Sequence, residues 1–181
     1  MPRMLLATIS FVFALTMTLV VPVAAAEEVT APDWTLESAD GETIRLSDEV
    51  REQPVILFFW ASWCPYCKAL MPHLQSIRLE FGDDVEILAL NFRDDGEPVE
   101  FIRNAGYDFT VLPNADEIAA EYGIFGTPGV LIVDREQVVR FDLRGLAKPE
   151  IPEDKAGHSA RAAYVAPYWA AEIRRYLDSA L

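Results

Sequence analysis

The two cysteines of this 181-residue chain, its only ones, stand two residues apart in the stretch WASWCPYC at positions 60–67. If the stretch is helical, Cys64 and Cys67 lie one turn apart, on the same side and within reach of a disulfide bond. Three kinds of chemistry use such a pair: a static structural disulfide, a metal site, or a redox pair that cycles between dithiol and disulfide.

The residues around this pair predict a strand that gives way to a helix. The run VILFFW (55–60) is typical of a strand buried on both faces, and after Cys64 apolar residues recur at helical spacing until Gly82. Cys64 therefore stands at a helix start, where free N–H groups and the positive end of the helix dipole stabilise a thiolate. We expect Cys64 to attack and the more buried Cys67 to resolve the mixed disulfide.

The residues next to the cysteines suit the same interpretation. Pro65 fits the first turn of a helix, where its missing N–H costs nothing. Trp63 and Tyr66 are expected to form an apolar rim that shapes the surroundings of the disulfide.

The alternatives to a redox pair have less support from the residues. A disulfide that closes a loop of two residues removes little chain entropy, so it stabilises a fold weakly. A zinc site needs four ligands, and the chain offers two cysteines and two histidines, His73 and His158, with no second C-x-x-C. A copper carrier that uses Cys64, Cys67 and His158 stays open as an alternative.

A second motif lies far along the chain, in GTPGVLIVD (126–134). A proline directly before a buried strand often marks a cis peptide bond in a tight turn. If Thr127–Pro128 is cis, the backbone of Thr127 faces outward and is free to pair with an extended substrate strand. An ordinary turn before a strand explains the spacing equally well.

The N-terminus indicates the compartment in which the protein works, and the net charge limits the classes of partner. Residues 4–21 carry no charge, Arg3 precedes them, and small residues at 24–26 precede Glu27. This pattern predicts an export signal cleaved after Ala26, with an uncleaved membrane anchor as the alternative, so residues 27–181 form the exported domain. The net charge of −14, without a cluster of Lys and Arg, excludes a nucleic-acid partner.

Periodicity predicts a mixed α/β fold with a central sheet covered by helices. Residues 33–48 read as a β-hairpin that turns at Asp40–Gly41, and the segment 146–163 reads as a surface loop. The remaining expected strands are 55–60, 85–92, 130–134 and 137–142, and the expected helices are 64–81, 97–105, 116–122 and about 167–180.

From position 33 to about 145 the chain resembles the thioredoxin superfamily, and more closely its exported branch of TlpA/ResA-type and cytochrome-c-maturation proteins. The resemblance rests on DWTLESADGETIRLSD, VILFFWASWCPYCKALMPHL and AAEYGIFGTPGVLIVDREQVVRFDLRG. Pro72 matches the family's helix-kinking proline, and Thr127–Pro128 matches its cis-proline opposite the active site. Residues 91–116 resemble the helix-containing insert of this branch.

The resemblance implies a thioredoxin-like fold and an exported, periplasmic thiol:disulfide oxidoreductase without an organic cofactor or metal. Cys64 and Cys67 are then the catalytic pair, and Trp63, Pro65, Tyr66, Thr127 and Pro128 contact the substrate. The expected partners are protein thiols or disulfides, such as apocytochrome c, and a membrane thiol electron donor. The branch suggests a reductant; a disulfide-donating oxidase or isomerase, a copper-handling chaperone and a non-catalytic binding module remain as alternatives.

Two positions depart from the family pattern. Phe58 stands where thioredoxins bury an aspartate six residues before the first cysteine, and Leu70 stands where ResA-like members carry a glutamate. Neither side chain accepts a proton. Proton transfer must therefore use water or a carboxylate that folding brings to the site.

Overall fold

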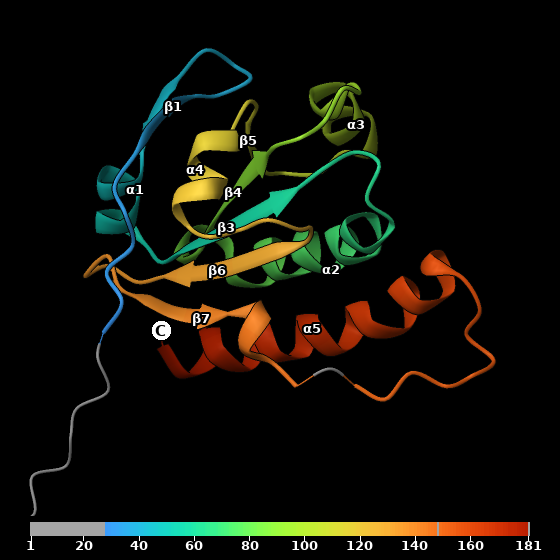
Figure 1. Ribbon diagram of the computed structural model, residues 1–181. Helices are drawn as coiled ribbons and strands as arrows, with labels where there is room; N and C mark the ends of the chain where they lie inside the picture. Colours follow the sequence, from blue (N-terminus) through green and yellow to red (C-terminus); the bar gives the residue numbers. More distant parts are fainter. Residues whose placement is uncertain (1–27, 148, 181) are drawn as a thin grey trace, which may run out of the picture.

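The computed structural model describes residues 28–147 and 149–180, and its centre is one five-stranded sheet (Figure 1). The strand order is β5-β4-β3-β6-β7. β3 runs parallel to β4 and β4 parallel to β5, whereas β6 is antiparallel to both β3 and β7, so the sheet is mixed as predicted. The strands are β3 (Val55–Trp60), β4 (Glu86–Asn91), β5 (Thr110–Leu112), β6 (Gly129–Val133) and β7 (Val139–Asp142).

The side chains of β3 alternate between two apolar cores, one on each face of the sheet. Ile56, Phe58 and Trp60 point into the first core, and Val55, Leu57 and Phe59 point into the second. All six residues of β3 are buried, which confirms the prediction of a strand covered on both faces.

Helices cover both faces of this sheet. α2 (Pro65–Phe81) and α5 (His158–Ala180) contribute to the first core, to which α3 (Pro98–Ala105) adds Ile102. α1 (Leu46–Glu52) and α4 (Asp116–Glu121) contribute to the second core. In Figure 1 α2 and α5 lie side by side, and the packing of these two helices is the most extensive helix–helix contact of the described chain.

The predicted N-terminal hairpin is present, but two short elements were missed. β1 (Thr35–Glu37) pairs antiparallel with β2 (Thr43–Arg45), and Gly41 in the turn has a positive φ of 83°. α1 was missed because a seven-residue helix with two buried side chains carries no measurable period. The three-residue β5, which follows α3 within the predicted insert, was missed for the same reason and forms one edge of the sheet.

The last helix begins nine residues earlier than predicted. The sequence placed residues 158–163 in a loop and Pro167 at the helix start, whereas α5 starts at His158 and Pro167 lies inside it. Pro167 is exposed, and the buried residues Ala162, Val165, Ala166 and Ala170 continue the same stripe on both sides of it. Burial of this stripe outweighs the one helical hydrogen bond that the proline removes.

The predicted export signal or anchor at residues 1–26 lies outside the described residues. Among the residues that the structure describes, no helix combines the length and the apolar character needed to cross a membrane.

Candidate redox site

Cys64 occupies the N-cap of α2, and a disulfide joins it to Cys67 with the two Cα atoms 5.3 Å apart. Pro65 fills the first helical position, as predicted. The backbone N–H of Cys67 donates to Sγ of Cys64 at 3.1 Å. The helix start thus offers the Cys64 sulfur a hydrogen-bond donor and the positive end of the helix dipole, and both favour its thiolate form.

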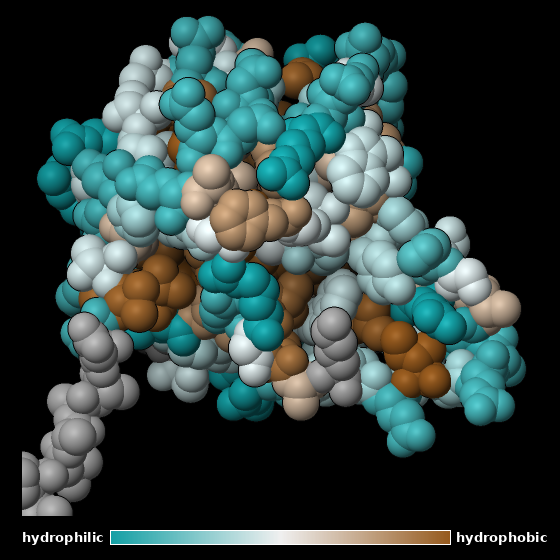
Figure 2. Space-filling view, viewed as in Figure 1, coloured by the Kyte–Doolittle hydropathy of each residue, from teal (hydrophilic) through white to brown (hydrophobic). Residues whose placement is uncertain are grey.

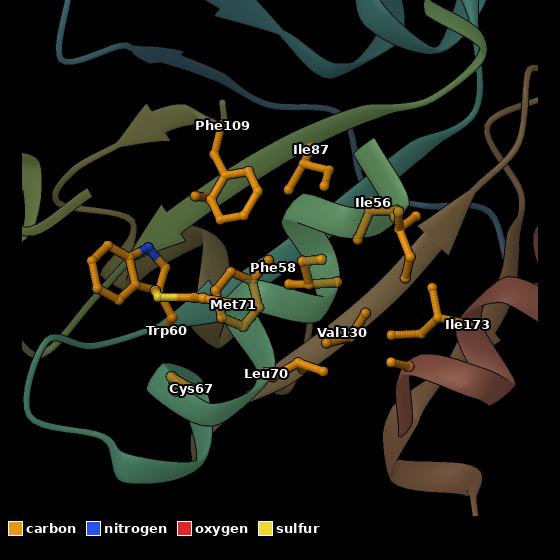
Figure 3. Close-up of a cluster of buried hydrophobic side chains, with 14 of the residues drawn as sticks. Ile56, Phe58, Trp60, Cys67, Leu70, Met71, Ile87, Phe109, Val130 and Ile173 are labelled. Carbon is orange, nitrogen blue, oxygen red and sulfur yellow. The ribbon is translucent and has the colours of Figure 1, made fainter. Parts of the chain in front are cut away.

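Both cysteines belong to the first apolar core, with Cys64 2% exposed and Cys67 fully buried. Cys67 lies there in one cluster with Phe58, Trp60, Leu70 and Met71 (Figure 3). Phe58 and Leu70 are the two positions at which the family pattern has a carboxylate. Both side chains belong to the apolar cluster around Cys67. An apolar surrounding disfavours a thiolate, whereas the N–H at the helix start favours one at Cys64. The roles of attacking thiol for Cys64 and resolving thiol for Cys67 stay predictions.

The metal-binding alternative finds no support in the part of the chain that the structure describes. There, no group of three or more His, Cys, Asp or Glu side chains is placed to hold a metal ion. His158 instead lies edge-on to the ring of Tyr66, with 6.2 Å between the ring centroids. The ligand set that a copper carrier requires is not assembled.

One side of the disulfide, which we call the Trp63 flank (Ser62, Trp63, Arg93 and Asp94), is held by hydrogen bonds to Asp94. The N–H and the hydroxyl of Ser62 donate to Asp94 at 2.5 and 2.7 Å, and the Asn91 amide and the Gly96 N–H donate to it at 2.8 and 3.0 Å. Burial alone raises the pKa of Asp94, but these donors outweigh burial and hold the pKa below its ordinary value.

The close approach at Asp94 depends on the absence of a side chain at Gly96. A Cβ there would lie 2.6 Å from Oγ of Ser62. No local pattern predicts this arrangement, because Asp94 stands next to Asp95 in a stretch that is typical of an ordinary solvated turn. The loop that precedes the cysteines is therefore anchored to the loop that follows β4.

Arg93 links two exposed aromatic residues on this flank. Nε1 of Trp63 donates to the carbonyl of Arg93 at 2.8 Å, and Nη1 of Arg93 donates to the carbonyl of Phe125 at 3.1 Å. The Trp63 and Phe125 side chains are 60% and 68% exposed. Arg93 thus orients Trp63, a predicted contact residue, and ties it to the loop that leads to Thr127.

The Thr127–Pro128 peptide bond is cis, which the motif left open and the family resemblance implied. It directly precedes β6, whose Gly129 pairs with Phe59 near the end of β3, so both motifs meet at the same end of the sheet. A Cβ at Gly129 would lie 2.9 Å from Cγ2 of Ile124, so the close packing beneath this turn requires glycine. Among the described residues, the backbone of Thr127 makes no hydrogen bond to another backbone group.

The other side of the disulfide, which we call the Tyr66 flank (Tyr66, His158 and Trp169), is built by ring packing against α5. The rings of Tyr66 and Trp169 lie 6.0 Å apart between centroids. Tyr66, Thr127 and Pro128 line one groove of about 370 Å³ together with residues of α5. The fold thus brings three of the predicted contact residues together, although Tyr66 is distant from the other two in sequence.

Comparison with protein-family models shows a match to the AhpC/TSA family over residues 28–142. The chain belongs to the AhpC/TSA family. It is 32% identical to the thiol-disulfide oxidoreductase ResA of Geobacillus thermodenitrificans over 124 residues, which cover 67% of this chain and 71% of that protein. It is 31% identical to the thioredoxin-like protein YneN of Bacillus subtilis, over 61% of this chain and 66% of YneN.

Solved structures agree with this assignment. A putative thiol:disulfide interchange protein DsbE from Chlorobium tepidum superposes with a TM-score of 0.58 at 27% identity, covering 64% of this chain and 82% of that one. A hypothetical protein from Sinorhizobium meliloti, SMc02350, has a TM-score of 0.65 at 20% identity over 87% of this chain and 85% of its own, which supports the fold. The predicted thioredoxin-like fold and the class of thiol-disulfide oxidoreductase are confirmed.

Proposed function

We propose that this AhpC/TSA family member works outside the cytoplasm as a reductant of protein disulfides. The observation that carries the proposal is the N–H of Cys67 at the helix start, which is directed at the Cys64 sulfur, while Cys67 is the more deeply buried of two cysteines in the same apolar core. A nucleophilic thiolate at Cys64 and a protected resolving thiol at Cys67 are what stepwise disulfide reduction needs.

The reaction runs in two exchanges. The Cys64 thiolate attacks one sulfur of the substrate disulfide, the substrate S–S bond breaks, and a mixed disulfide with Cys64 forms as the other substrate sulfur leaves as a thiolate. The Cys67 thiol then loses its proton and attacks the Cys64 sulfur, which releases the second substrate thiolate. Two electrons pass to the substrate, and the Cys64–Cys67 disulfide is left for an external dithiol donor to reduce.

Residues on both sides of the cysteines support the proposed docking of a protein substrate. Trp63 and Tyr66 stand on the two sides of the cysteines, and the unpaired backbone of Thr127, next to Pro128, suits an extended substrate segment. Pro65 sets the helix start between the cysteines. The proton of Cys67 passes to water or to a carboxylate that folding brings to the site, because Phe58 and Leu70 occupy the positions at which the family pattern has a carboxylate.

The cellular part of the proposal rests on the N-terminal sequence and on the relatives. The export pattern of residues 1–26 supports a location in the periplasm, with the domain free or anchored to the inner membrane. The relatives named ResA and DsbE are called a thiol-disulfide oxidoreductase and a thiol:disulfide interchange protein. We propose protein disulfides of the cytochrome-c-maturation type as substrates and a membrane thiol carrier as the electron donor.

The deciding measurement is the reduction potential of the Cys64–Cys67 pair, by equilibration of the protein with defined thiol buffers. We expect a value near or below about −270 mV, that of a thioredoxin-like reductant. A value near about −120 mV belongs to a strong oxidant, and would replace the proposed role with disulfide donation. Sequencing of the mature N-terminus from cell fractions tests export, with cleavage after Ala26 as the expected result.

A further inference from the structure

The groove beside the redox site is built largely by residues outside the family-matched part of the chain. Tyr66, Thr127 and Pro128 form its end near the cysteines, and Ile151, Arg161, Val165 and Trp169 extend it along α5; we call it the α5 groove. In Figure 2, apolar surface is visible between the first half of α5 and the segment that leads into this helix. The groove therefore offers a substrate a surface that continues beyond the redox site.

One stripe of α5 runs the length of this groove. Arg161, Val165 and Trp169 follow one another at intervals of four residues, so they lie on the same face of the helix. Trp169 packs against Tyr66, which stands between the two cysteines in sequence. The stripe thus lies beside Tyr66: the buried Val165 and the exposed Arg161 stand on the helix between Trp169 and His158, which both pack on this ring.

The charge of the α5 groove is opposite to that of the chain. The chain carries 29 acidic and 15 basic residues, yet the residues that line the groove include two arginines and no carboxylate. One of them, Arg144, is already paired with Asp142 at 2.6 Å. The net positive charge of the groove therefore resides on Arg161.

The Arg161 guanidinium is held in place and remains available to a ligand. Its Nε donates to the carbonyl of Lys155 at 3.2 Å. Within the described part of the chain, Arg161 has no carboxylate in ion-pair distance, and its two terminal nitrogens make no hydrogen bond. A guanidinium fixed through Nε presents those nitrogens in the geometry that suits a carboxylate.

We propose that the α5 groove binds the segment of a substrate polypeptide next to its reacting cysteine and selects segments that carry an acidic residue. The proposal rests on the proposed thiol-disulfide exchange and adds its specificity. The apolar stripe binds the segment, and Arg161 pairs with the carboxylate. Because the rest of this acidic protein repels a carboxylate, the pairing also sets the direction in which the segment lies.

The contacts of Tyr66 place Arg161 relative to the redox site. The Tyr66 ring packs on both His158 and Trp169, so the stretch of α5 that carries Arg161 lies beside the redox site. We therefore expect the preferred carboxylate within a few positions of the substrate cysteine.

The test compares peptides that differ at this one position. Each peptide carries one cysteine in a mixed disulfide with a 2-thiopyridyl group, and Glu, Gln or Lys two, three or four residues from it, in one series before and in another after the cysteine. The reduced full chain attacks through Cys64, Cys67 completes the exchange, and release of the thiopyridyl group is followed by absorbance. In one of the two series we expect the Glu peptide to react about fivefold faster than the Gln peptide, the size of one exposed ion pair, and the Lys peptide to react slowest.

Variants with a single arginine replaced test whether the preference for the Glu peptide depends on the α5 groove. Arg161→Gln should make the Glu and Gln peptides equal, and Arg161→Lys should keep part of the preference because it keeps the charge. Arg135→Gln is the matched control, since Arg135 is exposed in the turn after β6, at the end of that strand remote from Pro128. It should leave the preference unchanged.

Two results overturn the inference. Equal rates for the Glu and Gln peptides in both series with the parent chain, or a preference that survives Arg161→Gln, remove it while the thiol exchange itself stands. If the parent chain reduces none of the peptides, the proposed function fails and the inference fails with it.

Discussion

The two flanks of the disulfide are held by opposite kinds of contact. On the Trp63 flank, hydrogen bonds converge on Asp94 and a further one joins Trp63 to the backbone of Arg93. On the Tyr66 flank, the ring of Tyr66 packs between those of His158 and Trp169. The first flank lies within residues 28–142, which match the family, whereas the second depends on α5, which lies beyond them.

The difference suggests separate functions for the two flanks: the Trp63 flank positions the reacting sulfur, and the Tyr66 flank binds the substrate. Directional hydrogen bonds fix the loop that leads into Cys64, so they define the position of the attacking sulfur. Ring packing is less directional and tolerates exchange of one apolar residue for another, so the α5 side is free to change with the substrate. The following variants test this division, in order of expected effect.

The largest effect is expected at the sulfurs between the two flanks. Cys64→Ser should abolish disulfide exchange, because the chain then lacks its nucleophile. Cys67→Ser should still attack a substrate disulfide but should remain trapped as a mixed disulfide, which mass spectrometry detects. A Cys67→Ser chain that releases its substrate at the parent rate would contradict the assigned roles.

Loss of the Trp169 ring should break the Tyr66 flank. Trp169→Ala removes a half-buried ring that packs on Tyr66, so we expect the free energy of unfolding to fall by about 2–3 kcal/mol, less than for a fully buried tryptophan. Urea unfolding measures the change. Tyr164→Ala is the control on the same helix: this side chain is 40% exposed, and its loss should cost less than about 0.5 kcal/mol. Equal losses in the two variants would show that the contact with Tyr66 adds nothing.

Loss of the Asp94 charge should loosen the Trp63 flank by a smaller amount. In Asp94→Asn the carboxylate that accepts from Ser62, Asn91 and Gly96 becomes an amide with one acceptor oxygen, so we expect unfolding to become easier by about 1–2 kcal/mol. The rate of exchange should fall as the loop before Cys64 gains freedom. Asp95→Asn, at an exposed neighbour without such contacts in the described chain, should change neither quantity.

The smallest effect is expected in acid. There the difference in the free energy of unfolding between the parent chain and Asp94→Asn should decrease. Burial raises the pKa of Asp94, but its hydrogen-bond donors lower it further, below the ordinary value of 3.8. A depressed pKa in the folded state means that ionised Asp94 stabilises the fold above pH 3.8, and that this contribution is lost as the pH falls through the folded pKa. Unfolding curves of the two proteins should therefore differ by a constant amount at neutral pH and converge in acid. A difference that stays constant down to the lowest pH would show that the charge of Asp94 is not what holds the loop.

The sequence alone determined the chemistry of the site. The spacing of Cys64 and Cys67, the change from a strand pattern to a helix period at Cys64, and the proline before the last buried strands are local signals. Local signals can be recognised in the sequence alone, because backbone preference and periodic burial involve residues that are neighbours in the chain. The same reasoning failed for α1 and β5, which are too short to show a period, and for the start of α5, where Pro167 suggested a boundary that core packing overrides.

Only the tertiary structure decided what surrounds the two sulfurs. Asp94 binds Ser62 across 32 residues of sequence, and Trp169 reaches Tyr66 from the last helix. Asp94 read as part of a turn and Arg161 as part of a loop, because no local pattern distinguishes an anchoring carboxylate or a groove-lining arginine from solvated surface. Such contacts depend on which strands become neighbours and on which face α5 covers, and those choices are made by burial of apolar area over the whole chain rather than by any single segment.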